Sequence, residues 1–285
     1  MSKAKWLWLL LAGLIIALAA YLWRQGAEEP PTRTAPALPE EPRAEAPPPP
    51  APPPPPPAPA EPQVLHPIET AQQQLGQGAT ERAGEAPALS LDDSDAALQE
   101  ALTSLYGGQA PGQFFYVSDL VRRIVVTVDN LPRRQVPSRL SPMKPPGGPF
   151  ITSGESGSVY LGRDNYARYA PYIRLMQSAD PKQVVAAYVR LYPLFQQAYR
   201  ELGYPAGYFN DRLVEVIDHL LAAPEVSGPI RLVQPRVLYQ FEDPKLEALS
   251  AGEKLLIRMG SENAAKVKGT LRAIRQALTG QLPSQ

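Results

Sequence analysis

The feature that most constrains this chain is a single apolar span, Trp6 to Trp23, followed directly by a stem of proline and alanine. At a rise of about 1.5 Å per residue, a helix over this span covers about 27 Å, enough to cross a bilayer's hydrocarbon core with modest thinning. Residues 47–50 and 52–57 are all proline, which fixes φ and removes backbone donors, so we expect an extended stem without a fold. The sequence therefore predicts a domain, residues 89–279, tethered at a membrane.

The span is predicted to be a retained anchor, and a cleaved signal peptide is the alternative. Residues 17–19 have the small-x-small form of a signal-peptidase site. However, the apolar run is longer than a signal peptide requires and ends with Tyr21 and Trp23, while Trp6 and Trp8 lie near its start. Aromatic residues at both ends are typical of a helix that crosses both membrane interfaces. We therefore expect residues 6–23 to span the membrane.

The flanking charges predict the orientation of this anchor. Lys3 and Lys5 precede the span and Arg24 follows it, and the more cationic side of an anchor stays in the cytoplasm. Residues 1–5 are therefore expected in the cytoplasm and the domain on the opposite side. In a Gram-negative bacterium this is a single-pass inner-membrane protein with a periplasmic domain. A cytoplasmic domain is the alternative that a reporter fused after Gln285 would detect.

Amino-acid composition excludes several kinds of chemistry and of partner for this protein. The chain has no cysteine, which excludes disulfides, thiol catalysis and cysteine-based zinc sites. Residues 24–88 are predicted to be a disordered linker rich in proline and alanine, and residues 280–285 a tail. From residue 91 onward there are 22 Lys and Arg against 19 Asp and Glu. This small excess does not favour a nucleic-acid partner.

Hydrophobic spacing and capping residues predict a mostly α domain with one small β-hairpin. The hairpin is expected from residues 150–152 and 159–161, which flank a Gly-rich turn. Residues 132–149 are expected to be a loop, and residues 229–241 an extended strap. Helices are expected to begin near Asp92, Ser118, Asn165, Asp180, Asn210, Ser250 and Ser261.

Four segments of the domain carry a resemblance to a known family. They are residues 122–132, 166–172, 191–212 and 234–239. They resemble a bacterial family of membrane-anchored proteins with a C-terminal domain of unknown function. The resemblance spans residues 95–278 and implies the same order of anchor, proline-rich stem and helical domain. It brings no catalytic residues, because the family has none assigned.

Acidic residues on one predicted helix are the candidates for chemistry. Glu215 and His219 are four residues apart and form a weak candidate pair for a metal ion. Arg212 is within reach of Glu215, so a salt-bridged helix face is the simpler interpretation, and no cofactor is expected. Asp211, Glu215 and Asp218 support the alternative function, an envelope hydrolase or an enzyme that modifies glycans or lipids.

The remaining candidates are aromatic and cationic. Tyr and Arg are enriched at binding surfaces, although tyrosines at helical spacing also form a core with their hydroxyls at its rim. The candidate surface consists of Tyr204, Tyr208, Phe209, Asn210 and Arg212 at the start of one helix, with Arg133, Arg134 and Arg139 on a loop. The sequence thus predicts a membrane-tethered interaction or scaffold module, with an envelope protein or an anionic envelope component as its partner.

Overall fold

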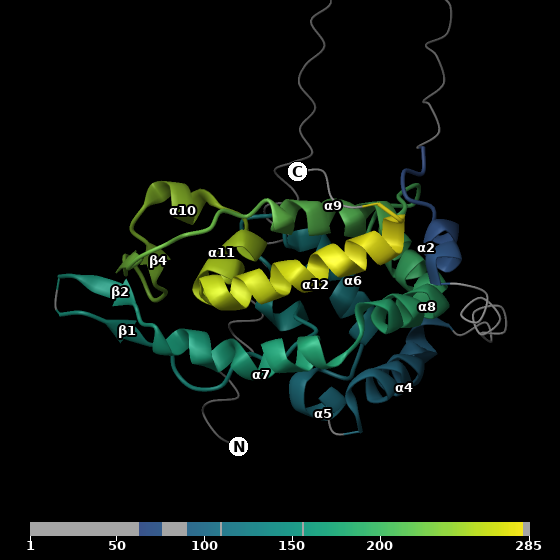
Figure 1. Ribbon diagram of the computed structural model, residues 1–285, viewed down its shortest axis with the longest axis horizontal. Helices are drawn as coiled ribbons and strands as arrows, with labels where there is room; N and C mark the ends of the chain where they lie inside the picture. The colour runs from purple at the N-terminus through teal and green to yellow at the C-terminus, as the bar shows by residue number, and fades with distance from the viewer. Residues whose placement is uncertain (1–62, 76–89, 109, 156, 282–285) are drawn as a thin grey trace, which may run out of the picture. The chain divides into compact units, whose positions relative to one another are not determined.

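The computed structural model describes residues 63–75, 90–108, 110–155 and 157–281 (Figure 1). The predicted span at residues 6–23 and most of the predicted linker lie outside these residues. Among the helices described, none is both long and apolar enough to cross a membrane.

Helices make up most of the described chain, which confirms the predicted mostly α class. The helices are α2 Ile68–Leu75, α4 Ser94–Tyr106, α5 Ala110–Phe114, α6 Leu120–Asn130, α7 Asp164–Ser178, α8 Pro181–Glu201, α9 Phe209–Leu221, α10 Pro244–Ala248, α11 Ala251–Arg258 and α12 Ser261–Thr279, with 3-10 turns η1 Leu91–Asp93 and η2 Ser138–Leu140. Helix α12 runs through the middle of the group of helices and contacts α2, α7, α8, α9 and α11 (Figure 1).

The main core lies between α6, α8, α9 and α12. Phe209, Val121, Val185 and Leu278 are almost completely buried in it. Phe209 stacks on Phe195 of α8 with ring centroids 5.9 Å apart. Each of these helices presents an apolar stripe to the others and a polar face to water, which is the pattern that drives helices together.

The sheet is larger than the predicted single hairpin. Strands β1 (Thr152–Ser153) and β2 (Val159–Leu161) form that hairpin, but β3 (Arg231–Val233) and β4 (Gln240–Phe241) add a second one. All four strands pair antiparallel in the order β1-β2-β3-β4. Buried Leu161, Leu232, Phe241 and Ile257 form a small second core there. Because the strands have only two or three residues, their alternation of apolar and polar side chains is too short to detect in the sequence.

The predicted linker, residues 24–88, is too long at its C-terminal side. Helix α2 lies within it and packs on α8 and α12, with Ile68 and Ala71 buried. An isolated helix of eight residues is unstable in water, and α2 has few apolar side chains to mark it. It forms because α12 and α8 provide an apolar surface for it.

Several predicted helix caps differ from the observed ones. Asp180 and Ser250 cap α8 and α11 as predicted, and Ser250 forms a full capping box with Glu253. In contrast, Tyr208 and Gly260 occupy the N-cap positions of α9 and α12, and neither provides a side-chain hydrogen bond to the helix. The predicted caps Asn210 and Ser261 lie inside these helices instead.

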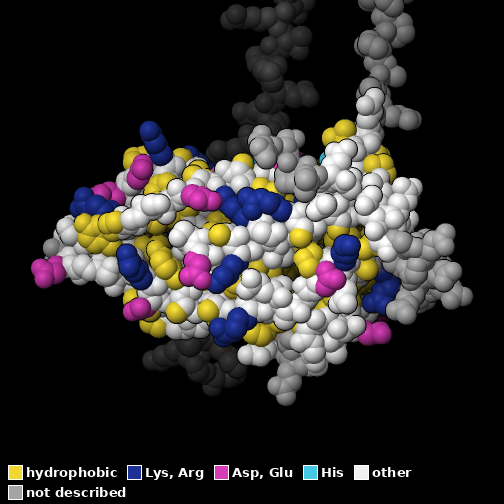
Figure 2. Space-filling view, viewed as in Figure 1, with side chains coloured by type: hydrophobic (Ala, Val, Ile, Leu, Met, Phe, Trp, Pro, Cys, Tyr) yellow, Lys and Arg dark blue, Asp and Glu magenta, His cyan; other side chains and the backbone are white. Residues whose placement is uncertain are grey.

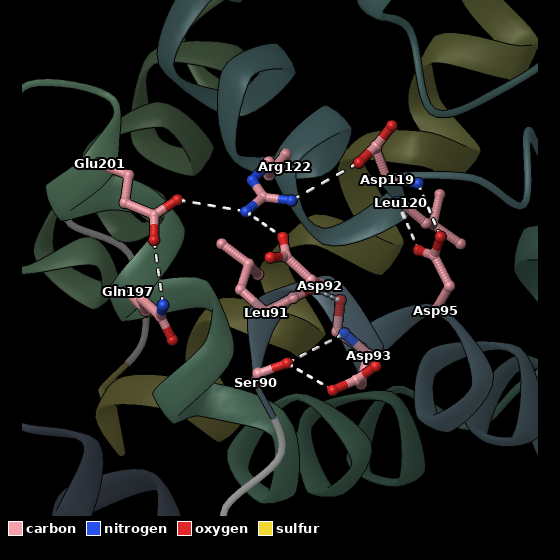
Figure 3. Close-up of polar contacts among 11 residues, drawn as sticks. Ser90, Leu91, Asp92, Asp93, Asp95, Asp119, Leu120, Arg122, Gln197 and Glu201 are labelled. Atoms are coloured by element: carbon pink, nitrogen blue, oxygen red, sulfur yellow. Dashed lines mark hydrogen bonds and ion pairs between the residues drawn. The ribbon is translucent and has the colours of Figure 1, made fainter.

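Helix α6 is capped by a residue of another helix rather than by the predicted Ser118. Its N-cap is Asp119, the only non-glycine residue with positive φ (53°) in the described chain. The backbone N–H groups of Asp119 and Leu120 donate to the carboxylate of Asp95 on α4, at 2.8 and 2.9 Å (Figure 3). Thus α4 supplies the oxygen acceptors that a local cap normally provides.

Arg122 on α6 joins three parts of the domain (Figure 3). Its guanidinium is 2.7 Å from Asp92 of η1, 3.4 Å from Glu201 of α8 and 3.5 Å from Asp119. The hydrogen bond to Asp92 and the charges of Asp92 and Glu201 raise the pKa of Arg122 despite some burial. All three carboxylates are largely exposed, so these ion pairs orient the segment before α4 and add little stability.

Candidate functional site

The predicted aromatic and cationic residues lie around the start of α9, which α8 holds in place. The side-chain oxygen of Gln196 accepts hydrogen bonds from the Phe209 N–H at 2.8 Å and the Tyr192 hydroxyl at 2.7 Å. Its amide nitrogen donates to the Gly207 carbonyl at 2.8 Å. Gln196 is buried, so these bonds satisfy its polar atoms and fix the backbone where α9 begins. Two separate groups of polar contacts extend from this point.

The first group, the Asp129 cluster, consists of Asp129, Arg133, Tyr204, Arg212 and Glu215. The Asp129 side chain is 3% exposed and lies 2.7 Å from Arg133 and 3.1 Å from Arg212. The Tyr204 hydroxyl donates to the same carboxylate at 3.3 Å, and Arg212 also donates to the Asp129 carbonyl at 2.8 Å. A buried carboxylate is stable only when charges and donors of this kind surround it.

The charges of the Asp129 cluster balance. Arg212 also pairs with Glu215 at 2.9 Å, so two guanidinium groups face two carboxylates. Burial of Arg212 disfavours its charge, but the hydrogen bond and charge of Glu215 and the charge of Asp129 outweigh this effect and raise its pKa. The cluster therefore links α6 to α9 without an excess positive charge for an anionic ligand. Asp129 was not among the predicted site residues, because its only signal in the sequence is an acid at the end of an apolar helix.

The second group, the N-terminal clamp, consists of Tyr208, Asn210 and Asp211 with the backbone of residues 65–68. The Asp211 carboxylate accepts from the N–H groups of Leu65 and His66 at 3.0 and 2.6 Å. The Tyr208 hydroxyl accepts from the Ile68 N–H at 2.9 Å. Asn210 donates to the His66 carbonyl at 2.8 Å and accepts from the Tyr188 hydroxyl at 3.2 Å. The clamp thus fastens the chain just before α2 to the start of α9.

The structure does not present all of the predicted residues as one surface. Phe209 and Asn210 are 1% and 0% exposed, so they belong to the core and are not surface residues. Tyr204, Tyr208 and Arg212 are partly buried and bonded within the two groups described above. The residues that face solvent are Arg133, Arg134 and Arg139 on the loop after α6. The Arg139 carbonyl accepts from Arg123 at 2.7 Å, which fixes the backbone and leaves the Arg139 side chain outside.

The helix carboxylates proposed for catalysis have different partners and do not converge. Asp211 binds backbone N–H groups, Glu215 pairs with Arg212, and Asp218 pairs with Arg275 of α12. Two acids that cleave a glycosidic bond must face each other across the substrate. Asp211 and Asp218 instead join α9 to other segments, and Glu215 pairs within α9 itself.

His219 contacts Ser250, which was predicted as a helix cap and not as a partner of this histidine. Its Nε2 lies 2.8 Å from the Ser250 hydroxyl and 3.5 Å from the Glu253 carboxylate. A catalytic triad needs the acid on the other ring nitrogen, and Ser250 is buried and caps α11. The predicted Glu215–His219 metal pair does not form, because the two side chains have different partners. The described residues contain no cluster of three or more possible ligands for a metal ion.

Two cavities lie at opposite parts of the domain. One, of about 280 Å³, lies beside the N-terminal clamp and is lined in part by Val64, Arg200, Pro205, Tyr208 and Asp211. The other, of about 400 Å³, lies at the start of α12 and includes Arg163, Glu225, Glu262 and Lys268. The buried Lys268 ammonium donates to the Ala223 carbonyl just after α9, so it has a structural partner. Neither cavity contains Ser250, His219, Glu215 or Asp218.

The fold and these contacts define a helical domain with a small antiparallel sheet and polar clusters that join its elements. The sequence matches the family described as "protein of unknown function (DUF3014)" over residues 120–275. This match covers more than half of the chain, and the protein belongs to this family. The resemblance to a family with a C-terminal domain of unknown function is confirmed to that extent. No curated protein and no solved structure matches the chain.

Proposed function

We propose that this protein is a membrane-tethered interaction module of the cell envelope. In this proposal residues 6–23 anchor the chain in the inner membrane, the proline-rich stem spans part of the periplasm, and the helical domain binds an envelope protein or an anionic envelope component. The sequence supports the anchor and the stem through the long apolar span with aromatic ends and the proline runs that follow it.

The N-terminal clamp is the observation that carries the proposal. The backbone N–H groups of Leu65, His66 and Ile68 donate to Asp211 of α9 and to its N-cap residue Tyr208, and the His66 carbonyl accepts from Asn210. A domain held by its N-terminal segment needs that segment to stay attached when the tether is pulled. The clamp transfers such a load from the chain before α2 to α9, which lies in the main core.

The partner surface in this proposal includes the exposed arginines of the loop after α6. Arg134 and Arg139 face solvent, and the Arg133 side chain is 54% exposed although one of its nitrogens binds Asp129. Guanidinium groups form paired hydrogen bonds with carboxylates and phosphates, so an acidic protein surface or an anionic polymer fits this loop. No observation in the described residues favours the hydrolase alternative over this function.

Photo-crosslinking in cells tests the partner surface. A photoreactive residue replaces Arg134 or Arg139 in the full chain at its native level, and the matched control replaces exposed Ser104 on α4. We expect a discrete adduct from the two loop positions and none from position 104. Equal labelling from all three positions would contradict a specific surface on this loop.

A second variant tests the tether. Replacing residues 6–23 with a cleaved signal sequence releases the domain into the periplasm without changing its fold. We expect the adduct to weaken, because the tether keeps the domain at high local concentration near its partner. An undiminished adduct from the released domain would show that tethering is not needed for binding, and a reporter fused after Gln285 checks the orientation.

A further inference from the structure

The loop between β3 and β4 presents the most exposed large apolar side chains of the described residues. Val237 and Leu238 are 85% and 76% exposed, and Val233 at the end of β3 is 38% exposed. Figure 2 shows hydrophobic side chains at the sheet end of the domain, with both Lys or Arg and Asp or Glu side chains around them. A single exposed apolar residue has little meaning, but two adjacent ones at the tip of a hairpin form a convex apolar protrusion.

The loop has a defined conformation that directs these side chains outward. Strands β3 and β4 pair through Leu232 with Phe241 and Val233 with Gln240, which holds both ends of the loop. Across it, the Gln234 side chain donates to the Val237 carbonyl at 3.0 Å, and Pro235 restricts the backbone next to it. The exposure of the apolar pair is therefore imposed by the fold.

Aromatic and cationic residues lie next to the apolar pair. Tyr239, directly after the apolar pair, is partly buried and stacks on Phe150 with ring centroids 5.6 Å apart. Arg236, directly before it, is exposed and is the only charged residue between positions 233 and 240. Exposed aliphatic side chains next to aromatic rings and a cation are the residue types found where proteins enter the interface of an anionic bilayer.

We infer that the tip of the β3–β4 hairpin, Val237 and Leu238, inserts into a lipid bilayer that contains anionic lipids. This inference rests on the proposed tether, which keeps a membrane within reach of every face of the domain. With the stem proposed above, a polyproline chain of 39 residues would reach about 120 Å at about 3.1 Å per residue. The sheet end, which lies away from α2 (Figure 1), is then within reach of the bilayer. Arg236 is the only charged residue of the loop, and the exposed Glu242 just after β4 is paired with Arg231, so the charge of the loop is complementary to anionic lipids.

The absence of cysteine from the chain allows a single-site probe. Leu238→Cys in the full chain is labelled with an environment-sensitive fluorophore and reconstituted into vesicles of phosphatidylethanolamine and phosphatidylglycerol. The matched control carries the same label at exposed Thr103 on α4. We expect a blue-shifted emission and strong quenching by spin-labelled acyl chains at position 238 only.

Arg236→Gln tests the role of the cation in the same vesicles. A basic residue near an anionic surface contributes about 1 kcal/mol, so we expect the ratio of inserted to free tip to fall about fivefold. The dependence on phosphatidylglycerol should weaken with it. An unchanged lipid dependence would overturn the electrostatic part of the inference.

The outcomes separate this inference from the proposed tether. If the labelled chain does not float with the vesicles, the proposed membrane anchor is wrong. If it floats but the probe at position 238 stays in water and is not quenched by lipid, insertion of the tip is wrong. A blue shift without lipid quenching that disappears when the protein is diluted among vesicles would overturn it in favour of a second copy of the chain.

Discussion

At the scale of single residues, Asp129 is the buried charge on which the contact between α6 and α9 depends. Its carboxylate is 3% exposed and binds two arginines and a tyrosine. Removing one member of a buried ion pair leaves the others without compensation, whereas a pair at the surface contributes little. The position of each charge therefore matters more than the number of ion pairs.

Asp129→Asn keeps the shape of the side chain and removes its charge. We expect the free energy of unfolding to fall by about 3 kcal/mol, because Arg133 and the partly buried Arg212 lose the buried anion that both of them contact. Chemical denaturation measures this change. Glu215→Gln is the control, since Glu215 is 65% exposed, and should cost less than about 1 kcal/mol. Similar losses for both variants would mean that Asp129 is not the centre of the cluster.

Replacing Asp211 is predicted to affect the N-terminal clamp and no other part of the domain. In Asp211→Ala, the N–H groups of Leu65 and His66 lose their acceptor, so we expect faster hydrogen exchange at residues 65–75 and a loss of about 1–3 kcal/mol. The rest of the domain should keep its protection. Glu215→Ala on the same helix is the control and should leave exchange at residues 65–75 unchanged; a general increase in exchange would contradict a local role.

At the scale of elements, α6 shows that a helix can be capped from elsewhere in the fold. Asp95→Ala removes the acceptor for the N–H groups of Asp119 and Leu120 and should cost about 1–2 kcal/mol. Asp92→Ala removes only an exposed ion pair with Arg122 and serves as the control. Thermal or chemical unfolding compares the two variants, and equal stabilities would argue against capping by Asp95.

A substitution at Asp119 is expected not to lower the stability of the domain, in contrast to Asp95→Ala. Its positive φ disfavours any residue with a Cβ, whereas glycine adopts this conformation freely. Asp119→Gly should therefore leave stability unchanged or raise it by up to about 1 kcal/mol, despite the loss of the weak contact with Arg122. Asp119→Ala keeps the strain and should be less stable than the glycine variant in the same denaturation experiment.

At the scale of the whole molecule, buried tyrosines make the domain sensitive to alkaline pH. Burial raises the pKa of Tyr188 and of Tyr192 above the ordinary value of 10.0, and the neighbouring Tyr208 adds to the shift at both. As the pH rises, the unfolded chain releases these protons before the folded chain does. Stability is therefore complete below about pH 10 and should fall above it, by about 1.4 kcal/mol per pH unit for each tyrosine.

Denaturation at pH 9 and pH 11, followed together with tyrosinate absorbance, measures this loss. Tyr188→Phe removes one of the groups and should reduce the difference between the two pH values. An unchanged difference in the variant would assign the alkaline loss to other groups.

The extent of the folded unit gives a further prediction. A chain that begins at Gly76 lacks α2 and exposes the surfaces of α8 and α12 that Ile68 and Ala71 cover. We expect it to be less stable than a chain that begins at Gln63 by about 3 kcal/mol or more, the usual cost of losing a buried aliphatic side chain and its neighbours. Equal melting temperatures would show that α2 is not part of the cooperative core.

The sequence predicted those elements whose signals are local. Helices α7 and α8 begin next to the predicted residues Asn165 and Asp180, and the helix start with a cap at Ser250 is confirmed. These segments are long and periodic, or they carry a cap that acts within four residues. The candidate site was predicted less well, because Tyr208, Asn210 and Asp211 bind residues about 140 positions away.

What the sequence determined by itself is the mostly α class of the domain, because this class depends on short-range periodicity; the order of span, stem and domain stays a prediction from composition. Only the tertiary structure decided that β3 and β4 extend the hairpin, that α2 belongs to the core and that Asp95 caps α6. Each of these rests on a surface or an acceptor that another element supplies after the chain has folded. A pattern within a few neighbouring residues does not indicate a partner that lies far away in the sequence.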